Sequence, residues 1–394
     1  MFWIASLASN IGTWVHEVGS GWLMSSLDES PQMVSSVRVA MSLPILLLAI
    51  PAGALADRVD RRRLLITIQI LLMAATTVLA ILTYTRAITP ASLLLLTVIM
   101  ALALVIHVPA WQASIPELVP REQIQQAVAL GSISFNLARS VGPALGGVLI
   151  ATFGTWVAFA VNGLSFAIVI AALVAWRRTT TDVCKPESFL AAIRTGSLYV
   201  IREPVMRNVL LRVILFVIPA SALWSLIPLI ARDQLHWDSR GYGYLVGAIG
   251  IGAVAAAVIL PRLRQTIGVD QTIFAAMCLF GSGLAVTSSS TSAVVTLAAM
   301  FVMGTGWMLA MTTLNSTAQI TLANAIRARG MAYFLSAMAG GMAVGAWLWG
   351  WIAQETSPQL AQLAAAAILP VHAVLGLMLP IRPQSEQSDL QLVR

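Results

Sequence analysis

Among the ionisable residues inside long apolar stretches of the chain, the candidates for proton coupling are Glu17, Arg139, Arg38 and His16. Charges within a bilayer are costly, so such residues are usually paired or functional. Glu17 and Arg139 each lie ~22 Å from the same end of their stretch, at 1.5 Å per helical residue. Equal depth favours a Glu17–Arg139 ion pair, with Arg38 as the alternative partner and His16 as a minor candidate. A protonatable carboxylate beside an arginine indicates proton coupling; a permanent structural salt bridge is the other interpretation.

Bulky aromatic and polar side chains in the same stretches are candidates for lining a substrate cavity. The candidates are Trp14, Trp22, His107, Asn136, Trp307 and Asn315. The tryptophans suit a bulky, partly aromatic molecule. For His107, packing between helices is favoured over facing a cavity. For the two asparagines, hydrogen bonds between helices are favoured over bonds to a substrate.

The composition of the chain indicates that these residues belong to a membrane protein. Of the 394 residues, 58% are hydrophobic and 10% are charged, whereas soluble domains carry ~25% charged residues. A membrane helix needs ~20 apolar residues, and continuous apolar runs favour helices over a barrel. The sequence therefore predicts an all-α membrane protein with twelve transmembrane helices. The predicted spans are 2–26, 33–56, 64–86, 91–113, 124–152, 155–176, 208–231, 242–261, 271–288, 293–317, 331–353 and 360–381.

The positive charges are concentrated in one set of the loops between these spans. If both termini lie on the same side, the loops of that side carry most of the 23 Lys and Arg residues, notably in 58–63 and 177–212. The positive-inside rule makes this side cytoplasmic. The net charge of +7 is thus explained by membrane orientation, and no nucleic-acid partner is expected.

The sequence contains no pattern typical of an enzyme. It has no phosphate-binding loop with a lysine after a strand, no Ser/His/Asp set in a hydrolase context and no metal-ligand spacing. We therefore expect no enzymatic activity, no cofactor and no metal ion.

The most distinctive loop follows the second span and reads GALADRVDRRR over residues 53–63. It combines a glycine, an aspartate and a dense group of arginines between two apolar spans. Its candidate residues are Gly53, Asp57, Arg58, Arg61, Arg62 and Arg63. One interpretation is that this loop only fixes the orientation of the protein in the membrane. The other is that it takes part in a conformational change of the protein.

A second motif lies in the fifth predicted span, where residues 136–147 read NLARSVGPALGG. Gly142, Gly146 and Gly147 would let helices approach closely, as small residues do in membranes. Pro143 lacks a backbone donor and can kink the helix. The motif therefore predicts a tightly packed helix at the centre of the protein.

These two motifs, with segments 10–24, 109–123, 241–253 and 313–330, resemble the major facilitator superfamily. The most similar group is the enterobactin-exporter-like group of bacterial efflux carriers. The resemblance implies that Asp57 braces the start of the eleventh span near Gly330, where a helix N-terminus favours negative charge. It also implies that the loop arginines pair with Glu117 or Glu122, forming a cytoplasmic latch. The motif in span five resembles one found in proton antiporters, although plain helix packing also explains its glycines.

The expected organisation is two six-helix halves, 1–178 and 208–382, joined by a cytoplasmic loop at 179–207 and followed by a tail at 383–394. Transporters of this kind bind substrate near the midplane between the halves. We therefore expect a monomeric exporter of a small siderophore-like or drug-like molecule, driven by proton antiport, in the lipid bilayer of the bacterial inner membrane with both termini cytoplasmic. An importer or facilitator on the same fold is one alternative, and a non-transporting membrane sensor or assembly partner is another.

Overall fold

The computed structural model describes residues 2–56, 60–176, 202–322 and 327–381, all of them in helices or short connections. The α-helices are α1 (Phe2–Leu27), α2 (Pro31–Ala56), α3 (Arg61–Tyr84), α4 (Pro90–Leu118), α5 (Ile124–Phe153), α6 (Trp156–Ala175), α8 (Pro204–Leu229), α9 (Ser239–Ser289), α10 (Ala293–Thr321), α11 (Arg327–Glu355) and α12 (Pro358–Leu377). A 3₁₀ turn, η1 (Arg121–Gln123), precedes α5, and a π-helical turn, η2 (Ile230–Gln234), follows α8. The tail and most of the central loop lie outside the described residues.

Ten helices of the described chain are long and apolar enough to cross a membrane. The serine- and glycine-rich α1 is not one of the ten. Helix α9 extends over two predicted spans, 242–261 and 271–288. Gly268, whose φ of 80° is not helical, divides it into two helical parts that correspond to these spans. The all-helical class is thus confirmed, while the number of twelve spans stays a prediction.

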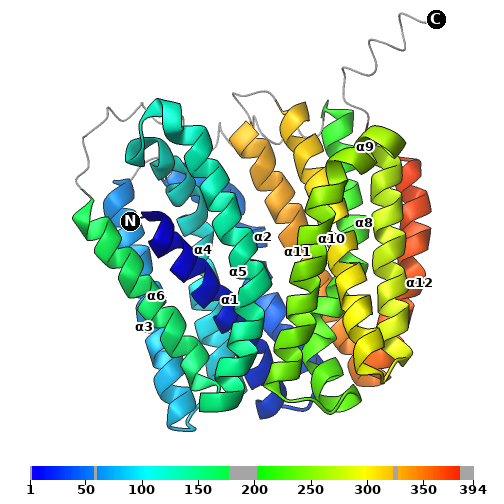
Figure 1. The fold of residues 1–394 in the computed structure, drawn as a ribbon, viewed down its shortest axis with the longest axis horizontal. Helices are drawn as coiled ribbons and strands as arrows, with labels where there is room; N and C mark the ends of the chain where they lie inside the picture. The colour runs from blue at the N-terminus through cyan, green and yellow to red at the C-terminus, as the bar shows by residue number, and fades with distance from the viewer. Residues whose placement is uncertain (1, 57–59, 177–201, 323–326, 382–394) are drawn as a thin grey trace, which may run out of the picture.

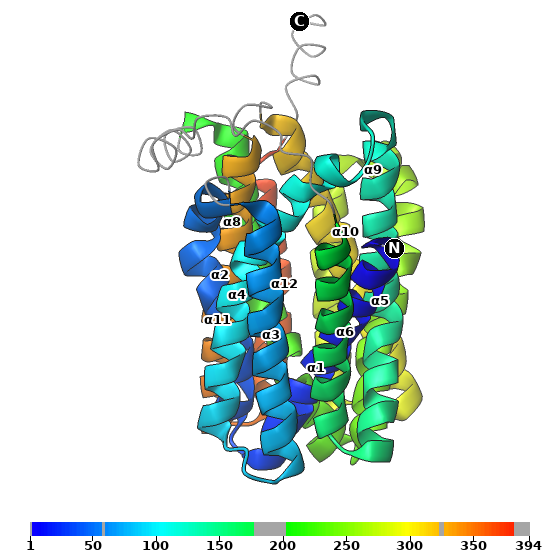
Figure 2. The same ribbon diagram turned by 90° about the vertical axis from the view of Figure 1, so that its left-hand side faces the viewer.

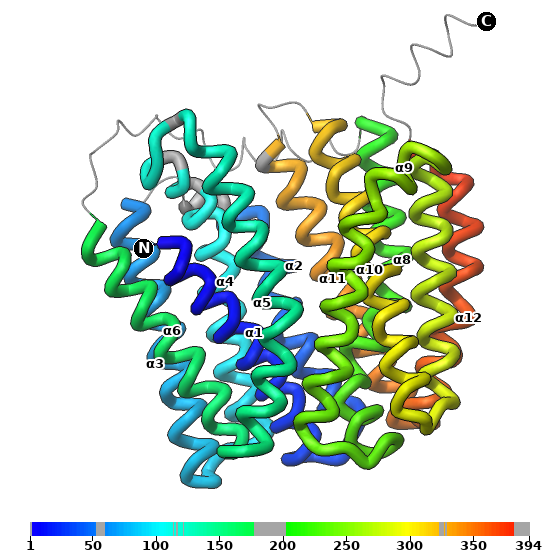
Figure 3. The backbone as a smooth tube through the Cα atoms, viewed as in Figure 1, coloured from blue at the N-terminus to red at the C-terminus, as the bar shows by residue number. Residues whose placement is uncertain are grey.

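The helices form two neighbouring groups, which we call the first group (α1–α6) and the second group (α8–α12) (Figures 1 and 3). Within the first group, α1 packs on α5 and α6, and α3 on α4 and α6. Seen from the side of this group, α3 and α6 stand in front (Figure 2). Between the groups, α2 packs along α11 and α5 along α9. These two helix pairs therefore form the boundary at which the groups meet.

The two ends of the bundle differ in charge. The basic end, at the top of Figure 1, carries the α2–α3, α4–α5 and α10–α11 connections, with Arg61, Arg62 and Arg63 opening α3. The opposite end carries the α1–α2, α3–α4, α5–α6 and α11–α12 connections. In Figure 1 the ribbons of the two groups meet at the opposite end and stand apart toward the basic end.

A proline in α8 shapes the core of the second group. Pro219 has no backbone N–H, so it leaves the carbonyl of Leu215 without its helical partner. The Nδ1 of His372 in α12 donates to that carbonyl at 2.7 Å. One residue before the proline, the carbonyl of Ile218 accepts from Nε1 of Trp349 in α11, also at 2.7 Å. Helix α8 is thus held by polar bonds to both α11 and α12.

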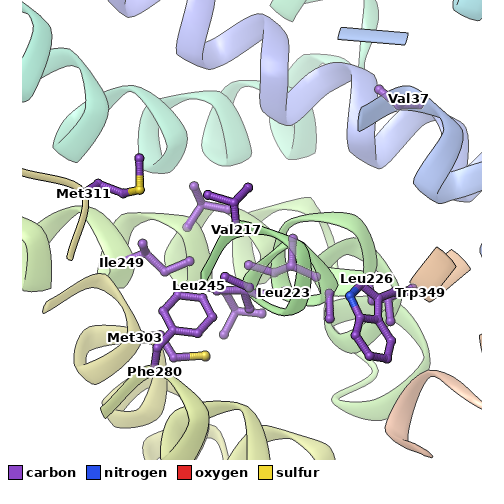
Figure 4. Packing of buried hydrophobic residues seen from close by; sticks show 14 of the residues in the cluster. Val37, Val217, Leu223, Leu226, Leu245, Ile249, Phe280, Met303, Met311 and Trp349 are labelled. Carbon is purple, nitrogen blue, oxygen red and sulfur yellow. The ribbon is translucent and has the colours of Figure 1, made fainter. Parts of the chain in front are cut away.

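Around these bonds the second group is filled by tightly packed apolar side chains (Figure 4). Phe280, Leu245 and Met303 are completely buried, and Ile249 is nearly so. They come from α9 and α10, the two helices that pack most extensively with each other. This core gives the second group a rigid frame for the polar residues at its boundary.

Candidate functional site

Glu17 and Arg38 form an ion pair inside the bundle, between α1 and α2. The Oε1 of Glu17 accepts from Nη1 of Arg38 at 2.7 Å, and the two side chains are 21% and 18% exposed. Both residues belong to the first group. The pair is thus partly exposed within the bundle, and the charges of Glu17 and Arg38 neutralise each other.

The structure thus pairs Glu17 with Arg38, the alternative partner, and not with Arg139 as preferred from the sequence. Glu17 lies ten residues from the opposite end of α1, and Arg38 seven residues from that end of α2, so the depths differ by only ~5 Å at 1.5 Å per residue. The long arginine side chain bridges that difference. Equal depth in the membrane does not determine the partner of an ion pair, because it does not say which faces of two helices are in contact.

Aromatic side chains from the second group surround this pair. The guanidinium carbon of Arg38 lies 5.6 Å from the ring centroid of Trp224 in α8, a cation–π distance. Trp22 of α1 stacks on Tyr242 of α9, with centroids 6.2 Å apart and planes inclined by 22°. The ion pair therefore lies where α1 and α2 of one group meet α8 and α9 of the other.

Arg139 lies in the middle of α5, directed at the second group. Its Nη2 is 3.6 Å from the sulfur of Met308 in α10. Its Nε is buried and has no hydrogen-bond partner among the described residues. The residue next to Met308, Trp307, packs in an aromatic cluster with Phe216, Trp224 and Phe280.

The two candidate histidines both pack inside the first group. His16 is 3% exposed and meets the ring of Phe159 in α6 edge-on at 5.0 Å, which separates it from the Glu17–Arg38 pair. The Nε2 of His107 lies 3.0 Å from Nε2 of Gln69 in α3, and its ring stacks on Trp111. Within the described residues no three His, Cys, Asp or Glu side chains are grouped so as to hold a metal ion.

The two asparagines form hydrogen bonds within their own helices, contrary to the favoured expectation of bonds between helices. Asn136 donates to the carbonyl of Ser132 at 2.8 Å, and Asn315 accepts from Gln319 at 2.6 Å. Each partner lies four residues away in the same helix, and it is a backbone carbonyl for Asn136 and a side chain for Asn315. Trp14 lies beside Phe135 with centroids 6.3 Å apart.

The glycines of the α5 motif serve two different interfaces. A Cβ on Gly142 would lie 2.6 Å from Cβ of Trp14, and one on Gly146 would lie 3.1 Å from Cα of Val15, so both face α1. A Cβ on Gly147 would lie 2.5 Å from the carbonyl oxygen of Ser239 and 3.0 Å from Cα of Gly243 in α9. The motif therefore joins α5 to its own group on one face and to the second group on the other.

Pro143 contributes to the same boundary. It leaves the carbonyl of Arg139 without a helical donor, and Gly250 of α9 lies against that carbonyl, 3.0 Å from a Cβ built on the glycine. The carbonyl of Pro143 itself lies 2.7 Å from a Cβ built on Gly243. Backbone meets backbone along this crossing, as small residues permit in membranes.

Adding a single methyl group at Gly147 is expected to destabilise the protein. In Gly147→Ala the new Cβ would overlap Ser239, and relieving such overlap costs ~1–3 kcal/mol of unfolding free energy. Gly131→Ala on the same helix is the control, because a Cβ at Gly131 has no atom within 4 Å. Thermal unfolding of the two purified variants in detergent measures the difference. Equal melting temperatures would contradict the close approach of α5 and α9.

Part of the candidate latch can be traced at the basic end. Arg61 pairs with Glu117, one of the two expected acids, at 2.7 Å between Nη1 and Oε1. Arg62 donates from Nε and Nη2 to the carbonyls of Leu173 and Val174 near the end of α6. The N-cap of α3 is Asp60, which accepts from the backbone of Arg63. These bonds all lie within the first group.

The other latch residues are placed less fully. Gly53 belongs to the last turn of α2, while Asp57 and Arg58 lie outside the described residues. A bond from Asp57 to the start of α11 therefore stays a prediction.

A second ion pair was missed from the sequence. Arg212 of α8 is 1% exposed, its Nη1 lies 2.7 Å from Oδ1 of Asp270 in α9, and its Nη2 donates to the carbonyl of Gly376 in α12. In the sequence Arg212 belongs to the basic stretch 177–212, but its neighbours on both sides in α8 are apolar. Asp270 follows the interruption at Gly268 by two residues. An arginine inside an apolar run near a loop was the signal that could have revealed the pair.

Comparison with known proteins agrees with this architecture. The family model described as transmembrane secretion effector, MFS_3, matches residues 1–392. The staphyloferrin A transporter of Staphylococcus aureus is 25% identical over 285 residues, covering 72% of both chains. The multidrug efflux pump Tap of Mycobacterium tuberculosis is 27% identical over 274 residues, covering 64% of this chain and 65% of Tap.

Solved structures share the fold at low sequence identity. The nucleoside transporter NupG superposes with a TM-score of 0.75 at 13% identity, covering 96% of this chain and 98% of NupG. The POT family transporter PepTSo superposes with a TM-score of 0.76 at 12% identity, covering 96% of each chain. The resemblance inferred from the sequence is thus confirmed at the level of the superfamily: the chain belongs to the transmembrane secretion effector family of major facilitator transporters.

Proposed function

We propose that this transporter exports a small siderophore-like or drug-like organic molecule in exchange for protons. It works by alternating access between two six-helix halves, as a monomer in the bacterial inner membrane with both termini cytoplasmic. The observation that carries the proposal is the Glu17–Arg38 ion pair at the junction of the two helix groups.

The pair offers a physical route from protonation to movement. When Glu17 takes up a proton, its attraction to Arg38 is lost, and an unpaired arginine inside a membrane protein must find other partners. Arg38 already contacts Trp224 of the second group. A change in its position therefore alters the contact between the groups at that point.

The contacts between the groups support alternating access. At the opposite end, Gly147 meets Gly243, and Gly350 of α11 lies against Gln32 of α2. At the same end, Ser30 donates to Gln354 at 2.7 Å. The ribbons stand apart toward the basic end (Figure 1). The contacts at the opposite end fit a state that is closed on that side, and an exporter in such a state loads its molecule from the basic, cytoplasmic side.

The relatives support the substrate class, since one is named a staphyloferrin A transporter and another a multidrug efflux pump. They do not share one cargo. The proposal is therefore restricted to small organic molecules of these two kinds.

Transport by purified protein in proteoliposomes tests the proposal. Enterobactin serves as a siderophore probe and ethidium as a drug-like probe, and a pH gradient is imposed across the vesicle membrane. We expect at least one probe to move against its own concentration gradient, in the direction opposite to the proton flow. Collapse of the pH gradient with nigericin should abolish that uphill movement.

Other outcomes identify the alternatives. Movement of a probe only down its own gradient would indicate a facilitator. Uphill movement in the direction of proton flow would indicate an importer. Binding without any movement would support a sensor or assembly partner and contradict the proposal.

A further inference from the structure

One edge of the Arg139 guanidinium binds no oxygen atom of the residues that the structure describes. Of the two nitrogens on this side-on edge, Nε has no hydrogen-bond partner among the described residues, and Nη2 reaches only the sulfur of Met308 at 3.6 Å. A thioether sulfur is a weak acceptor. The edge is therefore chemically unsatisfied.

Two other arginines of this protein show what the same edge normally binds. Arg232 donates from Nε and Nη2 to both carboxylate oxygens of Asp233, at 2.6 and 3.1 Å. Arg62 donates from the same two nitrogens to two backbone carbonyls. Side-on binding of two oxygens is the geometry that suits a guanidinium best.

No carboxylate of the described chain forms an ion pair with this edge. Glu17, the acid inside the bundle at a comparable depth, already pairs with Arg38. No ion pair of Arg139 occurs among the described residues, and Arg139 lies fifteen residues into a 30-residue helix. An unpaired charge at this depth is costly, so the site favours an anion from outside the chain.

The surroundings of the edge suit an apolar or aromatic body. Met308 has a flexible, polarisable side chain that adapts to ligands of different shape. Beside it, Trp307 lies 5.6 Å from Trp224 and 5.5 Å from Phe216 between ring centroids. Arg139 and Met308 come from different helix groups, and each lies near the middle of its helix. Transporters of this architecture bind substrate at such a midplane position.

We propose that the Nε–Nη2 edge of Arg139 binds a carboxylate of the transported molecule, so that the substrates are organic anions with an apolar or aromatic body. This inference rests on the proposed transport function and narrows its substrate class. The anion replaces the weak Met308 contact with two charge-assisted hydrogen bonds, and the molecule then bridges α5 and α10.

A matched pair of probes tests the charge requirement. 2-Naphthoate and 2-naphthamide share one aromatic body and differ in the charge of the oxygen-bearing group. Binding of each radiolabelled probe to the purified protein in lipid nanodiscs is measured by equilibrium dialysis. We expect wild type to bind 2-naphthoate about 10- to 100-fold more tightly than 2-naphthamide, as two hydrogen bonds to a charged group imply.

Three variants separate the charge from the packing. Arg139→Gln should abolish the preference for 2-naphthoate, while binding of 2-naphthamide stays unchanged. Arg139→Lys should retain a weaker preference, because a lysine keeps the charge but lacks the planar edge. Arg240→Gln, at an exposed arginine in the first turn of α9, is the control and should keep the full preference. Unchanged 2-naphthamide binding by Arg139→Gln also shows that this variant is folded.

The other results overturn the inference. Equal affinity of wild type for both probes, a preference that survives in Arg139→Gln, or no binding of either probe each contradicts an anion site at Arg139. If ethidium or enterobactin is still exported in the proteoliposome assay, only this inference fails and the proposed export function stands. If no probe moves there, the export function fails as well.

Discussion

Glu17→Gln is expected to uncouple transport from the proton gradient. The amide resembles the protonated carboxyl group in shape but cannot release or bind a proton. The side chain at position 17 is then always uncharged, and the ion pair with Arg38 cannot form. We expect exchange of a transported probe across the membrane to persist, while uphill movement driven by a pH gradient falls to the level seen without the gradient. Proteoliposomes with and without an imposed pH difference measure both quantities.

Glu29→Gln is the matched control, because Glu29 is exposed in the connection between α1 and α2. It should retain full uphill movement. If Glu17→Gln still concentrates a probe against its gradient, Glu17 is a structural partner of Arg38 and another group carries the proton.

Arg212→Met is expected to lower the free energy of unfolding by about 3 kcal/mol, because it leaves the carboxylate of Asp270 without its partner. This is the lower part of the range for buried pairs, since the side chain of Asp270 is 18% exposed. Arg207→Met is the control, because Arg207 is exposed on the same helix. It should change the stability by no more than ~0.5 kcal/mol. Denaturation in mixed micelles, followed by tryptophan fluorescence, measures both variants.

A second substitution separates the loss of the pair from the loss of packing. In Arg212→Met/Asp270→Leu neither charge remains, and apolar replacement of a buried pair is often neutral or stabilising. The double variant should therefore recover most of the lost stability. A double variant as unstable as Arg212→Met would show that packing, and not the unpaired charge, causes the loss.

The helices of this protein could be predicted because the apolar stretches are long and continuous. The ends of the predicted spans agree with α3 and α6 to within a few residues. The predicted spans 242–261 and 271–288 likewise lie on either side of Gly268, whose φ of 80° interrupts α9 between them.

The polar contacts could be predicted only in part, because they depend on the rotation of each helix about its axis. Residue number gives the depth of Glu17 in the membrane but not the direction in which its side chain points, and the preferred partner was therefore wrong. Arg212 shows a related difficulty. Its position near a loop suggested exposure, whereas packing among α8, α9 and α12 buries it.

The crossing of α5 and α9 has a consequence for how the protein can move. Helices usually lock together because ridges of side chains fit into grooves, and sliding them requires each ridge to climb over the next. At Gly147 and Gly243 there are no ridges, since two smooth backbone surfaces touch. A contact of this kind offers little steric resistance when one helix rotates over the other. We therefore expect the two groups to turn about this crossing during the proposed alternating-access cycle.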